Sequence, residues 1–493
     1  MKSPRDARPA HAQYDAAPAL FAVPDIDAER IGGEGYADVA EHGFTAASDD
    51  ARSTFSIDVD TASYSNVRRM LAARQLPPPE AVRIEELVNY FDYDYPEPDG
   101  DAPFAVVTEV GPCPWNPGNK LVHVGLQGRR LEPSASPPRN LVFLVDVSGS
   151  MQSEDKLPLL QRSLALLTDQ LRAEDRVGIV VYAGSSGIVL DSTPGDRHAK
   201  IKDALRELDS GGSTNGGAGI ELAYRVAQRG FVDGGVNRVV LATDGDFNVG
   251  LTSEQALHEL IVAKRESGVY LSVLGFGTGN LQDATMEQLA DKGNGNYGYV
   301  DTYEEARKLL VDEIGSTLVT IADDVKIQVE LDPREVSAWR LGGYDNRRLA
   351  HQDFNDDTKD AGEIGAGHSV TALYEIVPGE RRSGGQLMRV SLRHKPPGGQ
   401  HSVESWVDVA DREAQLTATS DDFRFAAAVA EVGLLLRSSE HRAAASWAHA
   451  IGLADGARGR DPACTRGGFV ALAIEAARLS GVTDVPEFTA CRS

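Results

Sequence analysis

The sequence has no apolar run long enough to cross a membrane, which takes about 20 consecutive apolar residues. Near the start of the chain, the apolar stretch Ala17–Val23 is short and is interrupted by Pro18. Residues 1–40 therefore contain no signal-peptide core. We expect a soluble chain without a transmembrane segment, although a processed or truncated export precursor would look the same.

Basic residues are also in short supply. The 49 Lys and Arg residues are outnumbered by 74 Asp and Glu residues, which gives a formal net charge of −25. Binding to nucleic acid requires a basic surface, so this balance argues against a nucleic-acid partner. It favours the binding of cations or of basic partners.

Cysteine is scarce as well, and the three residues are Cys113, Cys464 and Cys491. No C-x-x-C pair and no Cys/His spacing indicates a zinc site. Cys464 and Cys491 bracket the C-terminal segment and could form a disulfide there. Two ordinary free thiols agree with the spacing equally well, so both alternatives stay open.

The strongest pattern in the chain is the stretch Leu141–Met151, LVFLVDVSGSM. Its first five residues, Leu141–Val145, form an unbroken apolar run, which is typical of a strand buried on both faces of a parallel sheet. Asp146, Ser148 and Ser150 follow at alternate positions where that strand would end. Open α/β sheets bind ligands at this end of their strands, and carboxylate and hydroxyl oxygens suit a hard cation.

Two later stretches supply the rest of such a site. The loop Gly211–Gly219, GGSTNGGAG, presents Thr214, and a second buried strand, Val239–Ala242, leads to Asp244. The combination of D-x-S-x-S, a later Thr and an Asp at the end of another strand resembles the metal-ion-dependent adhesion site of the von Willebrand factor type A (VWA) family. The order, the spacing and the flanking apolar strands all agree with that family.

The resemblance implies a ligand set for the metal. Ser148, Ser150 and Thr214 match the family's hydroxyl positions, and Asp146 and Asp244 match its acidic positions, which often act through bound water. The implied ion is Mg²⁺, with Mn²⁺ or Ca²⁺ as alternatives. The rim of the site is expected to be formed by Gly149, Gly245, Asp246 and Asn248.

Other interpretations of these and similar acidic residues are weaker. Strand-end Ser and Asp side chains often cap helices, but five suitable residues in the right order favour the metal site. The run from Asp244 begins like an EF-hand loop, but Val249 and Gln255 stand where that loop needs Gly and Glu. Asp58 and Asp60 resemble the D-x-D pair of haloacid dehalogenase-type phosphatases, but a helix cap with solvated acids explains them better.

The length of 493 residues suggests two to four domains. Residues 1–52 predict a disordered leader. Residues 138–322 alternate strands and helices, which predicts a doubly wound, Rossmann-like α/β domain with a parallel sheet. Residues 323–412 alternate with a period of two, and we predict that they pair with two strands in residues 102–137, forming a β-sandwich that receives the α/β domain as an insertion. The other regions are an N-terminal helical extension, residues 53–101, and a C-terminal helical segment, residues 413–493.

The resemblance extends beyond the metal site. The segments FSIDVDTASYSNVRRML, LPPPEAVRIEELVNYFDYDYP and PCPWNP are similar to the N-terminal extension of a bacterial subgroup of VWA proteins, whose C-terminal part is a domain of unknown function. Members of that subgroup typically carry an export or lipoprotein signal. The resemblance therefore implies an extracytoplasmic location, in the periplasm or cell envelope, and a cytoplasmic location is the alternative.

Together these patterns predict a non-enzymatic adhesion or assembly module. The resemblance implies that the ion keeps one coordination position open for an Asp or Glu carboxylate of a partner protein. The alternative is a structural envelope or assembly scaffold whose metal site is vestigial or empty. A third class, a hydrolase, would need an activating base near Ser148 or Ser150, and the sequence offers no nearby His.

Overall fold

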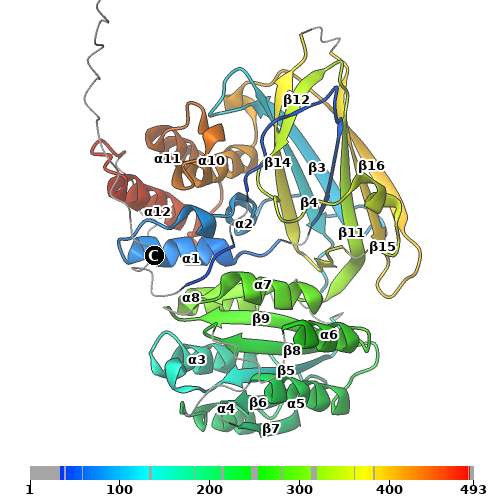
Figure 1. Ribbon diagram of the computed structural model, residues 1–493, viewed down its shortest axis with the longest axis vertical. Coiled ribbons are helices and arrows are strands. Elements are labelled where there is room, and N and C mark those ends of the chain that lie inside the picture. Colours follow the sequence, from blue (N-terminus) through cyan, green and yellow to red (C-terminus); the bar gives the residue numbers. More distant parts are fainter. Residues whose placement is uncertain are drawn as a thin grey trace, which may run out of the picture.

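A helix-covered sheet lies below two antiparallel sheets and a group of helices (Figure 1). The computed structural model describes residues 34–37, 40–57, 59–132, 136–183, 185–211, 216–245, 254–278, 281–312, 319–359, 361–380, 384–486 and 488. Across these ranges, every helix falls short of the length and apolar content that a bilayer crossing requires.

The lower sheet has six strands in the order β10-β9-β8-β5-β6-β7. They are β5 (Arg139–Asp146), β6 (Arg176–Tyr182), β7 (Ser186–Pro194), β8 (Val236–Thr243), β9 (Tyr270–Phe276) and β10 (Tyr297–Val300). All neighbouring strands from β10 to β6 pair in parallel. This confirms the predicted α/β class.

The edge strand β7 corrects the prediction of a purely parallel sheet, because it runs antiparallel to β6. Only residues 183–185 separate the two strands, and a parallel neighbour would need a crossover of a dozen or more residues. Strand β7 was not predicted, because its Ser, Asp, Thr and Pro residues are typical of a loop.

Helices cover both faces of this sheet. One face carries α3 (Leu157–Thr168), α4 (His198–Arg206) and α8 (Tyr303–Arg307), and the other carries α5 (Gly216–Arg229), α6 (Glu254–Arg265) and α7 (Asp283–Lys292). Along β5, Leu141 and Phe143 join the first core, whereas Val142 and Leu144 join the second. Burial on both faces explains the unbroken apolar run of this strand.

Two antiparallel sheets lie above the α/β domain. The first has the order β1 (Thr45–Ala46), β12 (Val336–Leu341), β14 (Ser369–Pro378), β4 (Lys120–Gly128) and β3 (Phe104–Pro112). The second has the order β13 (Ile364–Gly365), β11 (Thr320–Leu331), β15 (Gln386–Lys395) and β16 (Val403–Ala410), with β2 (Arg52–Ser56) also paired to β11.

These two sheets share one apolar core, to which β4 contributes Val122 and Val124, and β11 contributes Ile327 and Val329. Strand β4, before the α/β domain, pairs with β14, after it. The insertion hypothesis requires this kind of pairing, and the domain boundaries themselves stay a prediction. Strand β12 was not predicted from the sequence.

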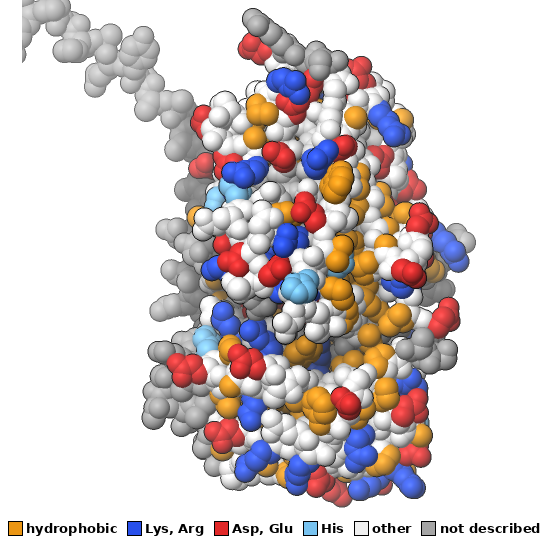
Figure 2. Space-filling model, turned by 90° about the vertical axis from the view of Figure 1, so that its right-hand side faces the viewer, with side chains coloured by type: hydrophobic (Ala, Val, Ile, Leu, Met, Phe, Trp, Pro, Cys, Tyr) orange, Lys and Arg blue, Asp and Glu red, His pale blue; other side chains and the backbone are white. Residues whose placement is uncertain are grey.

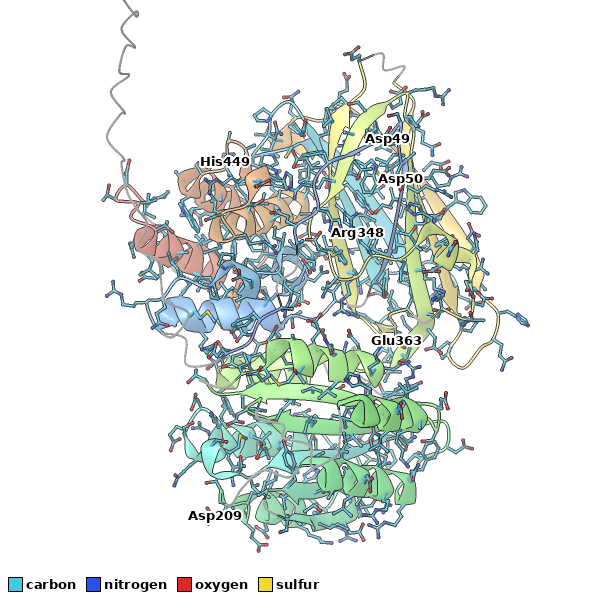
Figure 3. All side chains as sticks on the ribbon, viewed as in Figure 1. Asp49, Asp50, Asp209, Arg348, Glu363 and His449 are labelled. Carbon is cyan, nitrogen blue, oxygen red and sulfur yellow. The ribbon has the colours of Figure 1, made fainter. Side chains whose placement is uncertain are left out.

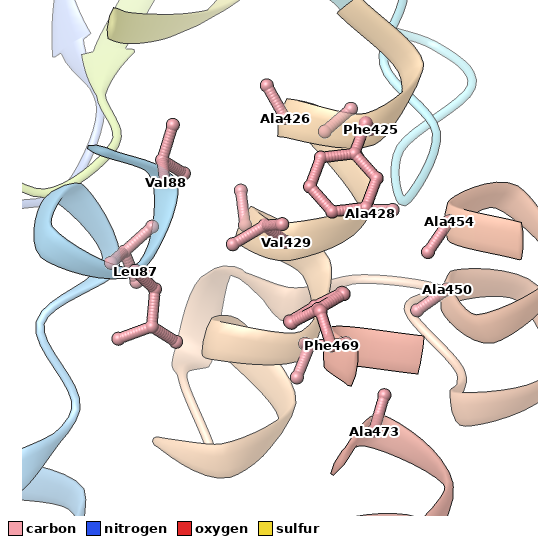
Figure 4. Packing of buried hydrophobic residues seen from close by; sticks show 14 of the residues in the cluster. Leu87, Val88, Phe425, Ala426, Ala428, Val429, Ala450, Ala454, Phe469 and Ala473 are labelled. Atoms are coloured by element: carbon pink, nitrogen blue, oxygen red, sulfur yellow. The ribbon is translucent and has the colours of Figure 1, made fainter. Parts of the chain in front are cut away.

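The helices before and after the sheets pack into one further core. It unites α1 (Ala62–Ala72) and α2 (Ile84–Asn89) with α10 (Asp421–Leu436), α11 (Trp447–Gly456) and α12 (Thr465–Leu479). Figure 4 shows Leu87 and Val88 of α2 beside Val429 of α10, with Phe469 of α12 in the same core. The N-terminal extension and the C-terminal segment are therefore packed against each other.

Part of the predicted disordered leader is ordered, and the prediction was wrong there. Strand β1 pairs with β12 through Thr45 and Trp339, and the side chain of Ala47 is buried in the core of the two sheets. The Gly and Ala residues of this segment do not indicate a strand. Strand β1 is stabilised by pairing with the distant strand β12 and not by its own composition. Residues 1–33 lie outside the described residues.

Candidate metal centre

The end of β5 brings three predicted ligands together. Asp146 is the last residue of the strand and is fully buried, and its Oδ1 accepts a hydrogen bond of 2.8 Å from the backbone N–H of Ser148. The chain then enters a 3₁₀ turn, Gly149–Gln152, which sets the Oγ atoms of Ser148 and Ser150 3.0 Å apart. Ser148 is buried whereas Ser150 is exposed, so the cluster reaches solvent at Ser150.

The second carboxylate comes from the neighbouring strand. Asp244 follows the last residue of β8, which pairs in parallel with β5, and its side chain is fully buried. Gly245 has a φ of +102°, a conformation that strongly favours glycine, so the predicted rim glycine provides the turn after the strand. The Thr243 hydroxyl accepts a hydrogen bond from the backbone N–H of Gly245.

Burial is the largest influence on the pKa of Asp146. It raises the pKa of the carboxyl group to about 6, and the negative charge of Asp244 acts in the same direction. Hydrogen bonds from Ser148, and one of 3.2 Å from the hydroxyl of Tyr182 to Oδ2, oppose this increase. A bound cation would favour the charged form of such a carboxyl group.

Lys156, which was not among the predicted site residues, also belongs to this cluster. The Nζ atom of Lys156 lies 2.8 Å from Oδ2 of Asp244, and both side chains are buried. Gly277, which has a φ of +72°, packs directly against the stem of this lysine, because a Cβ atom at position 277 would lie 2.2 Å from Cε of Lys156. The only signal in the sequence is the position of Lys156 just before helix α3, where a solvated lysine would be equally ordinary.

The remaining predicted ligands and rim residues are not all described. Thr214, Asp246 and Asn248 lie outside the described residues. The start of the loop that carries Thr214 is placed, because the backbone N–H of Gly211 donates a 2.7 Å hydrogen bond to the carbonyl of Val147. Asp209, just before this loop, lies at the outer edge of the α/β domain, away from the antiparallel sheets (Figure 3).

The donor set fits a hard divalent cation in chemical type. Asp146 and Asp244 offer carboxylate oxygens, Ser148 and Ser150 offer hydroxyl oxygens, and Lys156 shows that a positive charge is already accommodated there. Across the ranges that the structure describes, no group of three or more His, Cys, Asp or Glu residues is placed to hold a metal. This cluster differs from such sites because two of its four candidate donors are hydroxyls.

The phosphatase interpretation gains no support from Asp60. Its Oδ1 accepts a 2.8 Å hydrogen bond from the backbone N–H of Tyr297, and its Oδ2 lies 3.2 Å from Nη2 of Arg347. The first contact links the segment before α1 to β10 of the α/β domain and the second links it to the chain after β12, so the carboxylate has a structural role. Asp58 lies outside the described residues.

The cysteines also separate into two kinds. Cys464 is disulfide-bonded, and Cys113 is a buried free thiol. Cys491 lies outside the described residues.

Comparison with known proteins gives matches along most of the chain. Family models match residues 30–123 ("von Willebrand factor"), residues 140–312 ("von Willebrand factor type A domain") and residues 316–479 ("Uncharacterized protein YfbK, C-terminal"). The chain is 44% identical over 456 residues to the uncharacterized protein YfbK of Escherichia coli (strain K12), an alignment that covers 88% of this chain and 79% of that protein.

More distant similarities are shorter or weaker. Inter-alpha-trypsin inhibitor heavy chain H3 of Mesocricetus auratus is 24% identical over 284 residues, which cover 53% of this chain and 31% of that protein. A solved structure, a von Willebrand factor type A protein from Catenulispora acidiphila, aligns with a TM-score of 0.45 and 17% identity over 80% of this chain and 90% of that one.

Proposed function

The chain belongs to the family of the Escherichia coli protein YfbK, a family with a VWA domain, and we propose that it is a metal-dependent protein-binding module. The VWA match supports a protein-interaction module in general. The finer proposal, that a divalent cation recruits a carboxylate of a partner protein, rests on the cluster formed by Asp146, Ser148, Ser150 and Asp244. We propose Mg²⁺ as the ion, and the module as non-enzymatic and extracytoplasmic.

One observation carries this proposal: two buried carboxylates, at the ends of two adjacent parallel strands, lie in one cluster with two serine hydroxyls, and the cluster reaches solvent at Ser150. Asp146 and Asp244 are fully buried, whereas Ser150 is exposed. The negative charge is thus buried with Ser148, and the neutral hydroxyl group of Ser150 lies at the solvent-exposed side of the cluster. When bound, a divalent cation would supply a Lewis-acidic position that an incoming carboxylate could complete.

The chain's own residues hold the donors in place before any partner arrives. The backbone N–H of Ser148 and the hydroxyl of Tyr182 each donate to one oxygen of Asp146, which fixes the orientation of its carboxylate. The 3₁₀ turn fixes the two serine hydroxyls relative to each other. Such preorganisation lowers the entropic cost of binding.

The surface charge agrees with a protein partner. On the face in Figure 2, Lys and Arg side chains are interspersed with Asp and Glu side chains and do not gather into a continuous basic patch. This distribution supports the expectation, drawn from the net charge, that nucleic acid is not the partner.

A pull-down from envelope extract, with Mg²⁺ or with chelator, tests the proposal. We expect partner proteins to be retained only with Mg²⁺, and Asp146→Ala to lose this retention while its circular dichroism spectrum stays that of a folded chain. Asp169→Ala is the matched control, because Asp169 is an exposed carboxylate that pairs with Lys202. Metal-dependent retention by Asp146→Ala would contradict the proposal.

A second function, a scaffold with an empty site, is favoured by the contact between Lys156 and Asp244. An ammonium group bonded to a candidate ligand position provides positive charge without any metal. Calorimetric titration of the full chain with Mg²⁺ or Mn²⁺ separates the two functions. Saturable binding by the wild type, or by a variant that lacks the charge of Lys156, supports the metal-dependent module, and the absence of binding by both supports the scaffold.

A further inference from the structure

Lys156 is the one charged residue of the described cluster that the metal-binding pattern does not include. Its Nζ atom lies 2.8 Å from Oδ2 of Asp244, and only 8% of its side chain is exposed. A lysine is rarely buried unless it is paired. The fully buried carboxylate of Asp244 provides that partner, so the cluster contains a fixed positive charge next to a candidate metal ligand.

The surrounding backbone is shaped for this lysine. A Cβ atom at Gly277 would lie 2.2 Å from Cε and 2.3 Å from Cγ of Lys156, so glycine leaves room for the whole aliphatic stem. Gly277 directly follows the last residue of β9, and Lys156 directly precedes α3, so the backbone after β9 lies against the lysine stem. The stem is held by this contact at one end, and the ammonium group is held by Asp244 at the other.

We propose that Lys156 is a tethered cation that weakens metal binding at this site until a carboxylate arrives. The inference rests on the proposed function and specifies how that site is regulated. The ammonium group partly neutralises Asp244 and repels a divalent cation, so the ion alone binds less tightly than the two aspartates would otherwise permit. The same positive charge attracts an incoming carboxylate.

The formal charges show why the two effects belong together. Asp146 and Asp244 carry one negative charge each and Lys156 one positive charge, so these three side chains sum to one negative charge. A divalent cation changes this sum to one positive charge, and a single carboxylate then neutralises it. Without Lys156, the cation alone would neutralise the pair of aspartates, and a carboxylate would bring excess negative charge into a buried site.

The test is calorimetric titration of the full chain with Mg²⁺ alone and with Mg²⁺ in the presence of acetate. Lys156→Met keeps the stem and removes the charge. We expect it to bind Mg²⁺ about ten-fold or more tightly than the wild type does. We also expect acetate to strengthen Mg²⁺ binding in the wild type and to have a smaller effect in Lys156→Met.

Lys202→Met is the matched control, because Lys202 lies on α4 and pairs with the exposed Asp169. It should bind Mg²⁺ as the wild type does. Equal Mg²⁺ affinity in Lys156→Met and the wild type overturns the inference and leaves the metal-dependent module intact. If neither the wild type nor the Lys156 variants bind Mg²⁺ or Mn²⁺, the module itself fails, and the inference fails with it.

Thermal unfolding gives a second readout, and Lys156→Gln serves as a second variant if the methionine variant does not fold. In chelator, a neutral residue at this position should lower the melting temperature below that of the wild type, because buried Asp244 loses its counter-charge. Added Mg²⁺ should raise the melting temperature more in the variant than in the wild type. An equal rise in both proteins would overturn the inference.

Discussion

Among single residues, buried ionisable side chains tie the stability of this protein to pH. His123 on β4 is 1% exposed, and its Nε2 lies 2.8 Å from the hydroxyl of Tyr95. Burial lowers the pKa of this imidazole to about 4. The folded chain therefore keeps His123 neutral at pH values where an unfolded chain protonates it.

This pKa shift predicts a loss of stability in mild acid. Between about pH 6.5 and pH 4 the unfolded state binds a proton that the folded state does not, so the free energy of unfolding falls as the pH falls. The contribution of His123 is about 1.4 kcal/mol per pH unit, and it levels off below pH 4. Urea unfolding at pH 7 and pH 5 measures it.

The variant His123→Gln provides the control, because it cannot titrate in this range yet can still hydrogen-bond to Tyr95. Its loss of stability between pH 7 and pH 5 should be smaller than that of the wild type. An equal loss in both proteins would show that other groups cause the pH dependence.

At the level of secondary-structure elements, helix α7 of the α/β domain forms ion pairs with residues outside that domain. Asp283, Glu287 and Asp291 recur every four residues and so lie on one face of the helix. Arg83, just before α2, lies 2.5 Å from Asp283, whereas Arg347 lies 2.7 Å from Glu287 and 2.8 Å from Asp291. Two arginines from outside the domain thus neutralise an acidic stripe on α7.

Removal of one of these arginines should be costly. Arg347→Met leaves Glu287 and Asp60, both buried, without a shared cation. Breaking a buried ion pair from one side typically costs about 3–5 kcal/mol. Chemical denaturation of the full chain measures the change in the free energy of unfolding.

The comparison is Arg389→Met, since Arg389 pairs with Asp408 on an exposed strand surface. An exposed pair contributes less than about 1 kcal/mol, so this variant should be close to the wild type. If both variants lose the same stability, the α7 contact is no stronger than a surface ion pair.

For the molecule as a whole, the α/β domain depends on segments outside its predicted boundaries. Ala62 of α1 is part of the core between the sheet of the α/β domain and helices α5, α6 and α7. Arg68 of the same helix lies 2.5 Å from Asp301 and 2.7 Å from Glu305, close to α8. The domain therefore buries surface and charge against the N-terminal extension.

We accordingly predict that residues 138–322, produced alone, melt at a lower temperature than the full chain does. The excised domain exposes the core that Ala62 covers, and it leaves the acids of α7 and α8 without their arginines. Differential scanning calorimetry of both proteins checks this. An isolated domain that melts at or above the temperature of the full chain would contradict the prediction.

The sequence alone determined what depends on neighbours along the chain. Leu141–Val145 identified a strand buried on both faces, and the spacing of Asp146, Ser148 and Ser150 placed three donors at its end, because residues so close in sequence share one turn. The order of alternating strands and helices then determined the α/β class.

Only the tertiary structure decided which distant residues meet. Arg83 and Asp283 are 200 positions apart, and Lys156 and Asp244 are 88 apart, so no local pattern links them. Strand β7 and the ordered segment around Thr45 escaped prediction for the same reason, since each depends on pairing with another strand. A lysine in solvent and a lysine held against a buried carboxylate have the same neighbours in sequence, and their different roles arise from burial and charge, which the fold alone provides.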